Sequence, residues 1–163
     1  MKNTIITGVI IVLGLIGLMI WGKSNQTAEI PKNSDAISSL TTSEKLYDFG
    51  TISMKNGLVN HVFKVTNPSN KDIFVKKVST SCMCTQAYIG SAGGEKGPFG
   101  MEGMGYVPPA NEIIKAGESK DIKVVYDPNA HGPAGVGVID RFIYLVETNG
   151  ETTQLEIKAI VTP

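Results

Sequence analysis

Both cysteines of the chain lie in the segment SCMCT at residues 81–85, where a single methionine separates Cys82 from Cys84. In an extended segment, side chains two residues apart point to the same face, and their Cα atoms lie about 6.6 Å apart. That distance is near the upper limit for a disulfide, and a bridge there closes a very small, strained ring. Thiolates are good ligands for soft ions such as Cu(I) or Zn(II). The spacing predicts two thiols directed at one soft metal ion, with a reversible disulfide as the alternative.

Further soft ligands lie on two stretches that are rich in glycine and proline. Residues 90–109 read GSAGGEKGPFGMEGMGYVPP, and we expect a long loop insertion without a strand or helix of useful length. This insertion carries two methionines, whose thioether sulfur favours Cu(I). Residues 127–137 read DPNAHGPAGVG and supply a histidine, whose imidazole binds Cu(I) and Cu(II) alike. If these loops share one end of the fold, the sequence predicts a Cu(I) site with the ligands Cys82, Cys84, His131, Met101 and Met104.

Structural roles compete with ligation at these positions. Methionines on an exposed loop also suit an adaptable partner-binding surface, and His131 also suits a loop histidine bonded to backbone. We expect Met83 to point away from the cysteines and into the core. His61 shares a strand face with Phe63 and Val65, which predicts a core or rim histidine.

Composition argues against several other classes of function. Fifteen basic residues balance fifteen acidic ones without a basic stripe, so we predict no nucleic-acid binding. The glycine-rich stretch lacks the lysine and the following helix of a phosphate-binding loop. The carboxylates are scattered, and no serine has a matching histidine and aspartate pattern. The sequence therefore predicts no enzymatic activity.

Residues 1–43 are expected to lie outside the globular domain. Thr4–Gly22 contains no charged residue, and a helix of this length measures roughly 28 Å, close to the hydrocarbon thickness of a bilayer. We predict that residues 1–22 form an uncleaved transmembrane signal anchor, with cleavage after Ala28 as the alternative. Residues 23–43 are expected to be a linker. The flanking lysines weakly favour a domain outside the cytoplasm, either periplasmic or on the outer face of the cell.

From residue 44 onward, apolar residues recur at every second position, as in β-strands. The runs 139–146 and 155–161 flank Asn149 and Gly150, a pair that is typical of a β-hairpin turn. About seven short strands over residues 44–163 predict an all-β, Ig-like β-sandwich, preceded by the N-terminal transmembrane helix.

The order of several motifs resembles a bacterial family, the domain of unknown function 1573, which is similar to Hydin- and ASPM-type Ig-like domains. The motifs are YDFGTI at 47–52, HVFKVTNPS at 61–69, SCMCTQA at 81–87 and IKAGESKDIKVVYDP at 114–128. The resemblance covers roughly residues 45–163 and implies an Ig-like sandwich outside the cytoplasm, but no activity. Met83 stands where the family usually has glycine, and the insertion at 90–109 is a second departure.

Three functions follow as hypotheses. The first is a membrane-anchored extracytoplasmic domain, inserted through residues 4–22, that binds Cu(I) for delivery or for assembly of a metalloprotein. The second is a protein-interaction module with a partner in the cell envelope. The third is a thiol–disulfide redox protein that uses the Cys-x-Cys pair, although this pair lacks the helix N-terminus that activates Cys-x-x-Cys catalysts.

Overall fold

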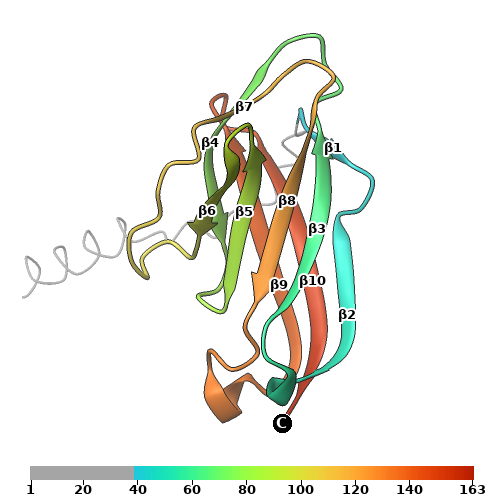
Figure 1. Cartoon of the computed structure of the whole chain (residues 1–163), viewed down its shortest axis with the longest axis vertical. Helices are drawn as coiled ribbons and strands as arrows, with labels where there is room; N and C mark the ends of the chain where they lie inside the picture. The colour runs from blue at the N-terminus through green and yellow to red at the C-terminus, as the bar shows by residue number, and fades with distance from the viewer. Residues whose placement is uncertain (1–38) are drawn as a thin grey trace, which may run out of the picture. The chain divides into compact units, whose positions relative to one another are not determined.

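The structure, a computed structural model, describes residues 39–163; the predicted anchor at 1–22 and most of the predicted linker lie outside the described residues. The described part consists of two five-stranded β-sheets and two short 3-10 helices, η1 (Met54–Asn56) and η2 (Gly132–Gly135) (Figure 1). No helix among residues 39–163 is long and apolar enough to cross a membrane.

The first sheet has the strand order β1-β3-β8-β5-β6. Its strands are β1 (Thr41–Thr42), β3 (Val59–Thr66), β8 (Ser119–Tyr126), β5 (Thr85–Ser91) and β6 (Gly94–Phe99). The central pair, β3 and β8, runs antiparallel with Val59 opposite Tyr126 and Thr66 opposite Ser119. Since side chains alternate along each strand, this register turns every second residue of both strands toward the second sheet.

The second sheet has the strand order β2-β10-β9-β4-β7. Its strands are β2 (Leu46–Ser53), β10 (Thr152–Thr162), β9 (Gly137–Glu147), β4 (Ile73–Thr80) and β7 (Glu112–Ile114). β2 pairs with β10 in parallel, whereas β9 and β10 form an antiparallel hairpin. The turn of this hairpin contains Asn149 and Gly150, as the sequence predicts.

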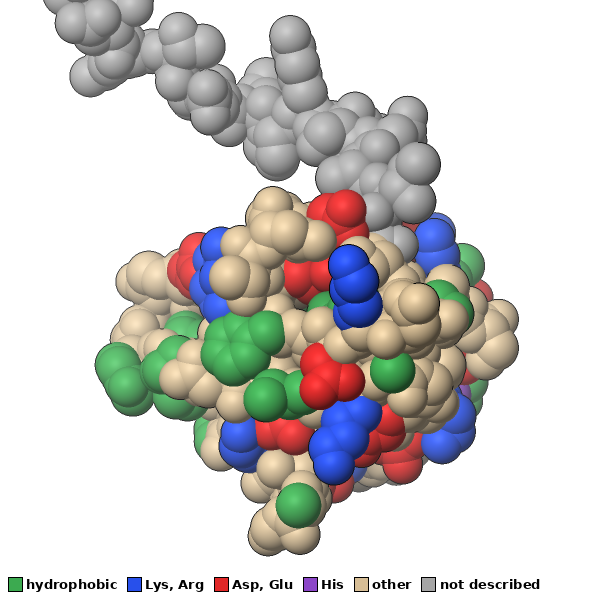
Figure 2. Space-filling view, turned by 90° about the horizontal axis from the view of Figure 1, so that it is seen from above, with side chains coloured by type: hydrophobic (Ala, Val, Ile, Leu, Met, Phe, Trp, Pro, Cys, Tyr) green, Lys and Arg blue, Asp and Glu red, His purple; other side chains and the backbone are tan. Residues whose placement is uncertain are grey.

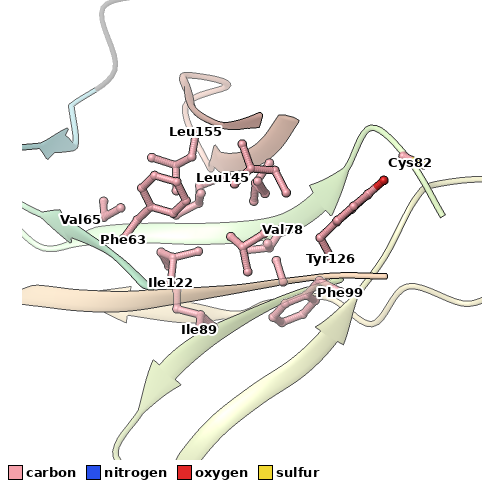
Figure 3. Close-up of a cluster of buried hydrophobic side chains, with 14 of the residues drawn as sticks. Phe63, Val65, Val78, Cys82, Ile89, Phe99, Ile122, Tyr126, Leu145 and Leu155 are labelled. Carbon is pink, nitrogen blue, oxygen red and sulfur yellow. The ribbon is translucent and has the colours of Figure 1, made fainter. Parts of the chain in front are cut away.

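The core lies between the two sheets, where aliphatic and aromatic side chains from both inner faces meet (Figure 3). It includes Phe63, Val65, Val78, Ile89, Phe99, Ile122, Tyr126, Leu145 and Leu155. Fully burying a side chain of this size contributes roughly 1.5–3 kcal/mol to folding. Figure 3 shows the hydroxyl end of Tyr126 pointing out of this core toward the segment that carries Cys82.

The all-β architecture is confirmed, but the expected strand count of seven is too low, because the described part contains ten. The domain also begins earlier than residue 44. Leu40 is buried, and Thr41 and Thr42 pair with Thr66 and Val65 of β3. Thr41 and Thr42 show no alternation of apolar residues that would predict a strand, and they are a strand only because they pair with β3.

The expectation that residues 90–109 contain no strand is wrong, because Gly94–Phe99 forms β6 against β5. Glycine is required here rather than merely tolerated. A Cβ at Gly97, whose φ is 141°, would lie 2.8 Å from the carbonyl oxygen of Ala87 and from the ring of Tyr88. The absence of a side chain therefore lets β6 approach β5 closely, while Phe99 at its end enters the core.

An ion-pair cluster joins the sheets beside β7. The carboxylate of Glu112 lies 2.6 Å from Nζ of Lys96 and 3.3 Å from Nζ of Lys120, and both lysines belong to the first sheet. Burial raises the pKa of Glu112, but hydrogen bonds and positive charge from the two lysines outweigh it and hold this pKa below its usual 4.5. Elsewhere, on the face in Figure 2, acidic and basic side chains lie interspersed.

Replacing Glu112 with glutamine is expected to lower the free energy of unfolding by about 1–3 kcal/mol at pH 7, since two lysines lose a charged acceptor. Because the folded-state pKa of Glu112 is depressed, its stabilisation is present above the unfolded-state value of 4.5 and disappears as the pH falls through the folded-state pKa. Urea unfolding at pH 7 and at acid pH should therefore show a gap between wild type and variant that narrows in acid. Glu95→Gln, which breaks an exposed pair with Lys123, is the matched control with a much smaller effect. A gap independent of pH would contradict the assignment.

Candidate functional site

Cys82 and Cys84 lie on the tight turn between β4 and β5, where they form a disulfide. The Thr85 N–H donates to the Cys82 carbonyl at 3.1 Å, which closes the turn and brings the two Cα atoms to 5.2 Å. The extended segment expected from the sequence, with its wider spacing of about 6.6 Å, is therefore wrong. Met83 at the tip is 49% exposed, so the prediction of a core role fails as well, because the tip of a turn has no core beneath it.

Backbone and hydroxyl contacts fix the position of this turn. The Thr80 hydroxyl lies 3.0 Å from the carbonyl oxygens of both Cys82 and Thr85. The N–H of Asp127, just after β8, donates to the Cys84 carbonyl at 2.9 Å. The turn is thus held to the end of the first sheet, and the two sulfur atoms have a defined position relative to the loop that follows β8.

His131 lies on that loop, directly before η2. Its Nε2 atom is 3.2 Å from Sγ of Cys82, although the two residues are far apart in sequence. The ligand atoms of Cys82, Cys84 and His131 all lie within 4.8 Å of one another, with both cysteines buried and the histidine exposed. The structure therefore brings three of the five predicted ligands together, on two connections that both lie in the lower half of Figure 1.

The two predicted methionine ligands have different surroundings. Met101 follows β6 and forms a parallel bridge with Thr80, two residues before Cys82, so its backbone lies beside the base of the cysteine turn. Met104 is 58% exposed, and its N–H donates to the Met101 carbonyl at 3.4 Å. Ligation by either methionine stays a prediction.

Arg141 is a site residue that the sequence reasoning missed. It is the chain's only arginine, and its Nε donates to Sγ of Cys84 at 3.3 Å while its Nη1 donates to the Asp140 carbonyl at 2.8 Å. The alternation of residues 139–145 already placed Arg141 in register with Ile139 and Ile143. A single cation among apolar residues on one strand face could have indicated a site residue, because a partly buried charge needs a partner.

Each sulfur of the pair has its own nitrogen neighbour, His131 for Cys82 and Arg141 for Cys84. Beside them, burial raises the pKa of Tyr126, with a smaller opposing effect from the charge of Arg141 and a further increase from Asp127. The phenol is therefore neutral at physiological pH, and the guanidinium is free to compensate negative charge on sulfur. The arrangement suits either a disulfide or two thiolates beside an imidazole.

His61 takes no part in this group. Its Nε2 lies 2.8 Å from a carboxylate oxygen of Glu44, and its ring stacks on Tyr47 with the centroids 3.6 Å apart. It packs edge-on against Phe63 at the border of the core. The predicted rim histidine is confirmed.

Comparison with solved structures shows the fold. The chain is similar to a protein of unknown function from Porphyromonas gingivalis W83, with a TM-score of 0.54, 14% identity, and coverage of 76% of this chain and 46% of that one. It is also similar to a family 123 glycoside hydrolase from Clostridium perfringens, with a TM-score of 0.51, 6% identity, and coverage of 72% and 22%. The chain thus spans less than half the length of either protein, and at these identities the likeness shows the fold alone. No curated protein matches the chain.

The family comparison covers the strands that carry the cysteine turn. Residues 40–99 match the family described as "Protein of unknown function (DUF1573)". The match runs from β1 to β6 and includes Cys82 and Cys84, but it ends before Met101, Met104 and His131. The resemblance to this family that was inferred from the motifs is therefore confirmed over residues 40–99.

Proposed function

We propose that the chain is a non-enzymatic, extracytoplasmic domain, anchored in the membrane through residues 4–22, that binds Cu(I) once its two cysteines are reduced. Its role is copper delivery or assembly of a metalloprotein in the cell envelope. The observation that carries the proposal is the approach of three ligand atoms, from Cys82, Cys84 and His131, to within 4.8 Å of one another.

The chemistry of the donor set supports a soft ion. Two thiolates and one imidazole are ligands that suit Cu(I) and Zn(II), whereas harder ions prefer oxygen. Backbone contacts hold both cysteines on one turn, so that opening the disulfide releases two sulfur ligands that already share a position.

Charge favours a monovalent ion at this position. Two thiolates with Cu(I) carry a net charge of −1, which the guanidinium of Arg141, bonded to Cys84, balances. With a divalent ion, the thiolates alone neutralise the metal, and the nearby guanidinium is left as an uncompensated positive charge. Unbalanced charge in a partly buried site is unfavourable.

A protein-interaction module is the second candidate. Two large side chains of the loop after β6, Tyr106 and Met104, are 86% and 58% exposed. Large exposed aromatic and methionine side chains suit a partner-binding surface. Metal binding that depends on the cysteines separates the two candidates.

The test is a Cu(I) titration of the full-length chain, kept reduced and anaerobic, in competition with a chromophoric Cu(I) chelator. We expect a single Cu(I) ion per reduced chain, little binding to the oxidised chain, and loss of binding in the Cys82→Ser/Cys84→Ser variant. Met83→Leu is the matched control, because it changes an exposed sulfur-containing residue in the same turn. Equal Cu(I) binding by the reduced wild type and the double serine variant would overturn the proposal.

A further inference from the structure

The two sulfur atoms of the disulfide have unequal surroundings. Cys82 is 9% exposed and lies beside the exposed His131, whereas Cys84 is 2% exposed. Sγ of Cys84 accepts a hydrogen bond from Arg141 at 3.3 Å and lies 3.7 Å from the hydroxyl of Thr85. Cys84 is therefore the more enclosed residue and has a permanent positive charge against its sulfur, whereas the sulfur of Cys82 contacts an exposed histidine.

From this asymmetry we infer an activity beyond metal binding: the disulfide exchanges electrons with an external dithiol, and it does so with fixed polarity. The incoming thiolate attacks Sγ of Cys82, and Cys84 leaves as the thiolate. Arg141 contacts the leaving sulfur directly and stabilises the negative charge that forms on it.

Access decides which sulfur is attacked. Thiol–disulfide exchange requires the attacking sulfur, the attacked sulfur and the leaving sulfur to lie in line, so the attacked sulfur must be open on the side away from its partner. Sγ of Cys82 lies beside the exposed side chain of His131, which a thiol can approach from solvent. Cys84 is enclosed, its carbonyl bonded to the N–H of Asp127 and its sulfur in contact with Arg141. An external protein thiol therefore reaches Cys82 first.

The leaving sulfur must carry a negative charge, and this favours the same direction. A thiolate in a buried position is unfavourable unless a donor or a cation stabilises it. At Cys84 the guanidinium Nε–H donates directly to the sulfur, and a charge-assisted hydrogen bond of this kind strengthens as the sulfur becomes a thiolate. Since a more stable leaving thiolate departs faster, departure of Cys84 is the favoured path.

The full exchange balances as a two-electron transfer. The first thiolate of the external dithiol bonds to Cys82, the bond between Cys82 and Cys84 breaks, and its electron pair moves to Cys84. The second thiolate of the dithiol then attacks the first sulfur of its own molecule, which releases Cys82 as a thiolate and leaves the dithiol oxidised. The two protons lost by the dithiol are taken up by the cysteines or remain in solvent when the cysteines stay ionised. Reduction of the disulfide by an external dithiol must therefore come before the two cysteines can bind a metal ion.

The direct test uses the oxidised full-length chain, free of metal and with chelator present. Glutathione is added as a monothiol probe, the mixture is quenched with an alkylating agent, and mass spectrometry locates both adducts. We expect glutathione on Cys82 and the alkyl group on Cys84. The opposite placement, or equal amounts of both, would overturn the inference, and no variant is required for this result.

A second measurement tests the role of Arg141. The rate of disulfide opening by glutathione is expected to fall about tenfold in Arg141→Gln and to recover partly in Arg141→Lys, since lysine keeps the charge but not the fork of donors. Urea unfolding of each oxidised variant controls for a general loss of structure. The position of the glutathione adduct is measured in wild type and does not depend on the stability of any variant. An unchanged rate in folded Arg141→Gln would remove Arg141 from the proposal. Because all assays are metal-free, a chain that exchanges thiols but binds no Cu(I) contradicts the proposed copper function alone.

Discussion

Replacing His131 with glutamine is expected to weaken Cu(I) binding by the reduced chain at least about tenfold. Loss of a residue that only orients a metal ligand already lowers metal affinity by about that factor, and His131 is itself a ligand in the proposed site. The imidazole is the only nitrogen ligand that the described residues bring to Cys82 and Cys84. Without it, two thiolates alone hold the ion. Glutamine keeps a polar side chain of moderate size on an exposed loop, so the fold is expected to stay intact.

Two matched controls make this prediction specific to the site. His61→Gln removes the chain's other histidine, which is bonded to Glu44 and lies outside the ligand group. Met104→Leu removes a predicted ligand whose side chain is 58% exposed. Competition titration with a Cu(I) chelator compares all three with wild type. An affinity unchanged in His131→Gln would contradict the three-ligand site, and a loss in Met104→Leu equal to that in His131→Gln would restore the methionine to the coordination shell.

The parts of the fold that depend on local signals were predictable from the sequence. The strands β3, β8, β9 and β10 each have one buried face and one outward face, so apolar residues recur at every second position. This alternation can be read directly from the sequence. The β9–β10 hairpin is marked by Asn149 and Gly150, whose conformational freedom suits the turn. These signals need no knowledge of which strands pair.

The missed strands depend on partners that the sequence does not name. β6 contains three residues, Gly94, Gly97 and Pro98, that are unfavourable in strands, and it exists because β5 supplies a paired edge and because Gly97 permits close contact. β1 is only two residues long and is defined by its pairing with β3. Propensity could not find either strand, because β6 forms through a tight hairpin with β5 and β1 through pairing with β3, which is distant in sequence.

The candidate site was predictable in composition but not in geometry. Cys82 and His131 meet because the connections after β4 and β8 lie at the same end of the fold. The sequence predicted the site only on the assumption that these loops share one end. The turn that shortens the distance between the cysteines could not be seen, because the segment contains no glycine or proline to mark it. The sequence places Arg141 on the same strand face as Ile139 and Ile143, but its partner became identifiable only from the contact between β9 and the cysteine turn.

Replacing Asn67 with alanine is expected to lower the free energy of unfolding by about 2–4 kcal/mol, because several buried hydrogen bonds are lost at once. Asn67 is 0% exposed, and its Nδ2 donates to the carbonyls of Lys71 at 2.8 Å and Ile114 at 2.9 Å. Its Oδ1 accepts from the backbone N–H of Ser69 at 3.0 Å and from the Ser69 hydroxyl at 2.7 Å. Asn67, which belongs to the HVFKVTNPS motif, thus ties the β3–β4 turn to the end of β7. Alanine leaves these groups without their partner.

Two further variants separate this explanation from a simple loss of side-chain volume. Ser69→Ala removes one exposed hydroxyl and is expected to have a much smaller effect, whereas Asn67→Asp keeps the shape but removes both Nδ2 donations and should be at least as destabilising as alanine. Urea unfolding at one pH compares the three, and Asn67→Ala no less stable than Ser69→Ala would contradict the role. Thr66 pairs with Ser119, at the opposite end of β8 from Tyr126, so Asn67 lies at the end of the sandwich away from the cysteine turn. Folded Asn67→Ala should therefore keep the Cu(I) affinity of wild type, because the hydrogen bonds of Asn67 and the three proposed ligands lie at opposite ends of the two sheets.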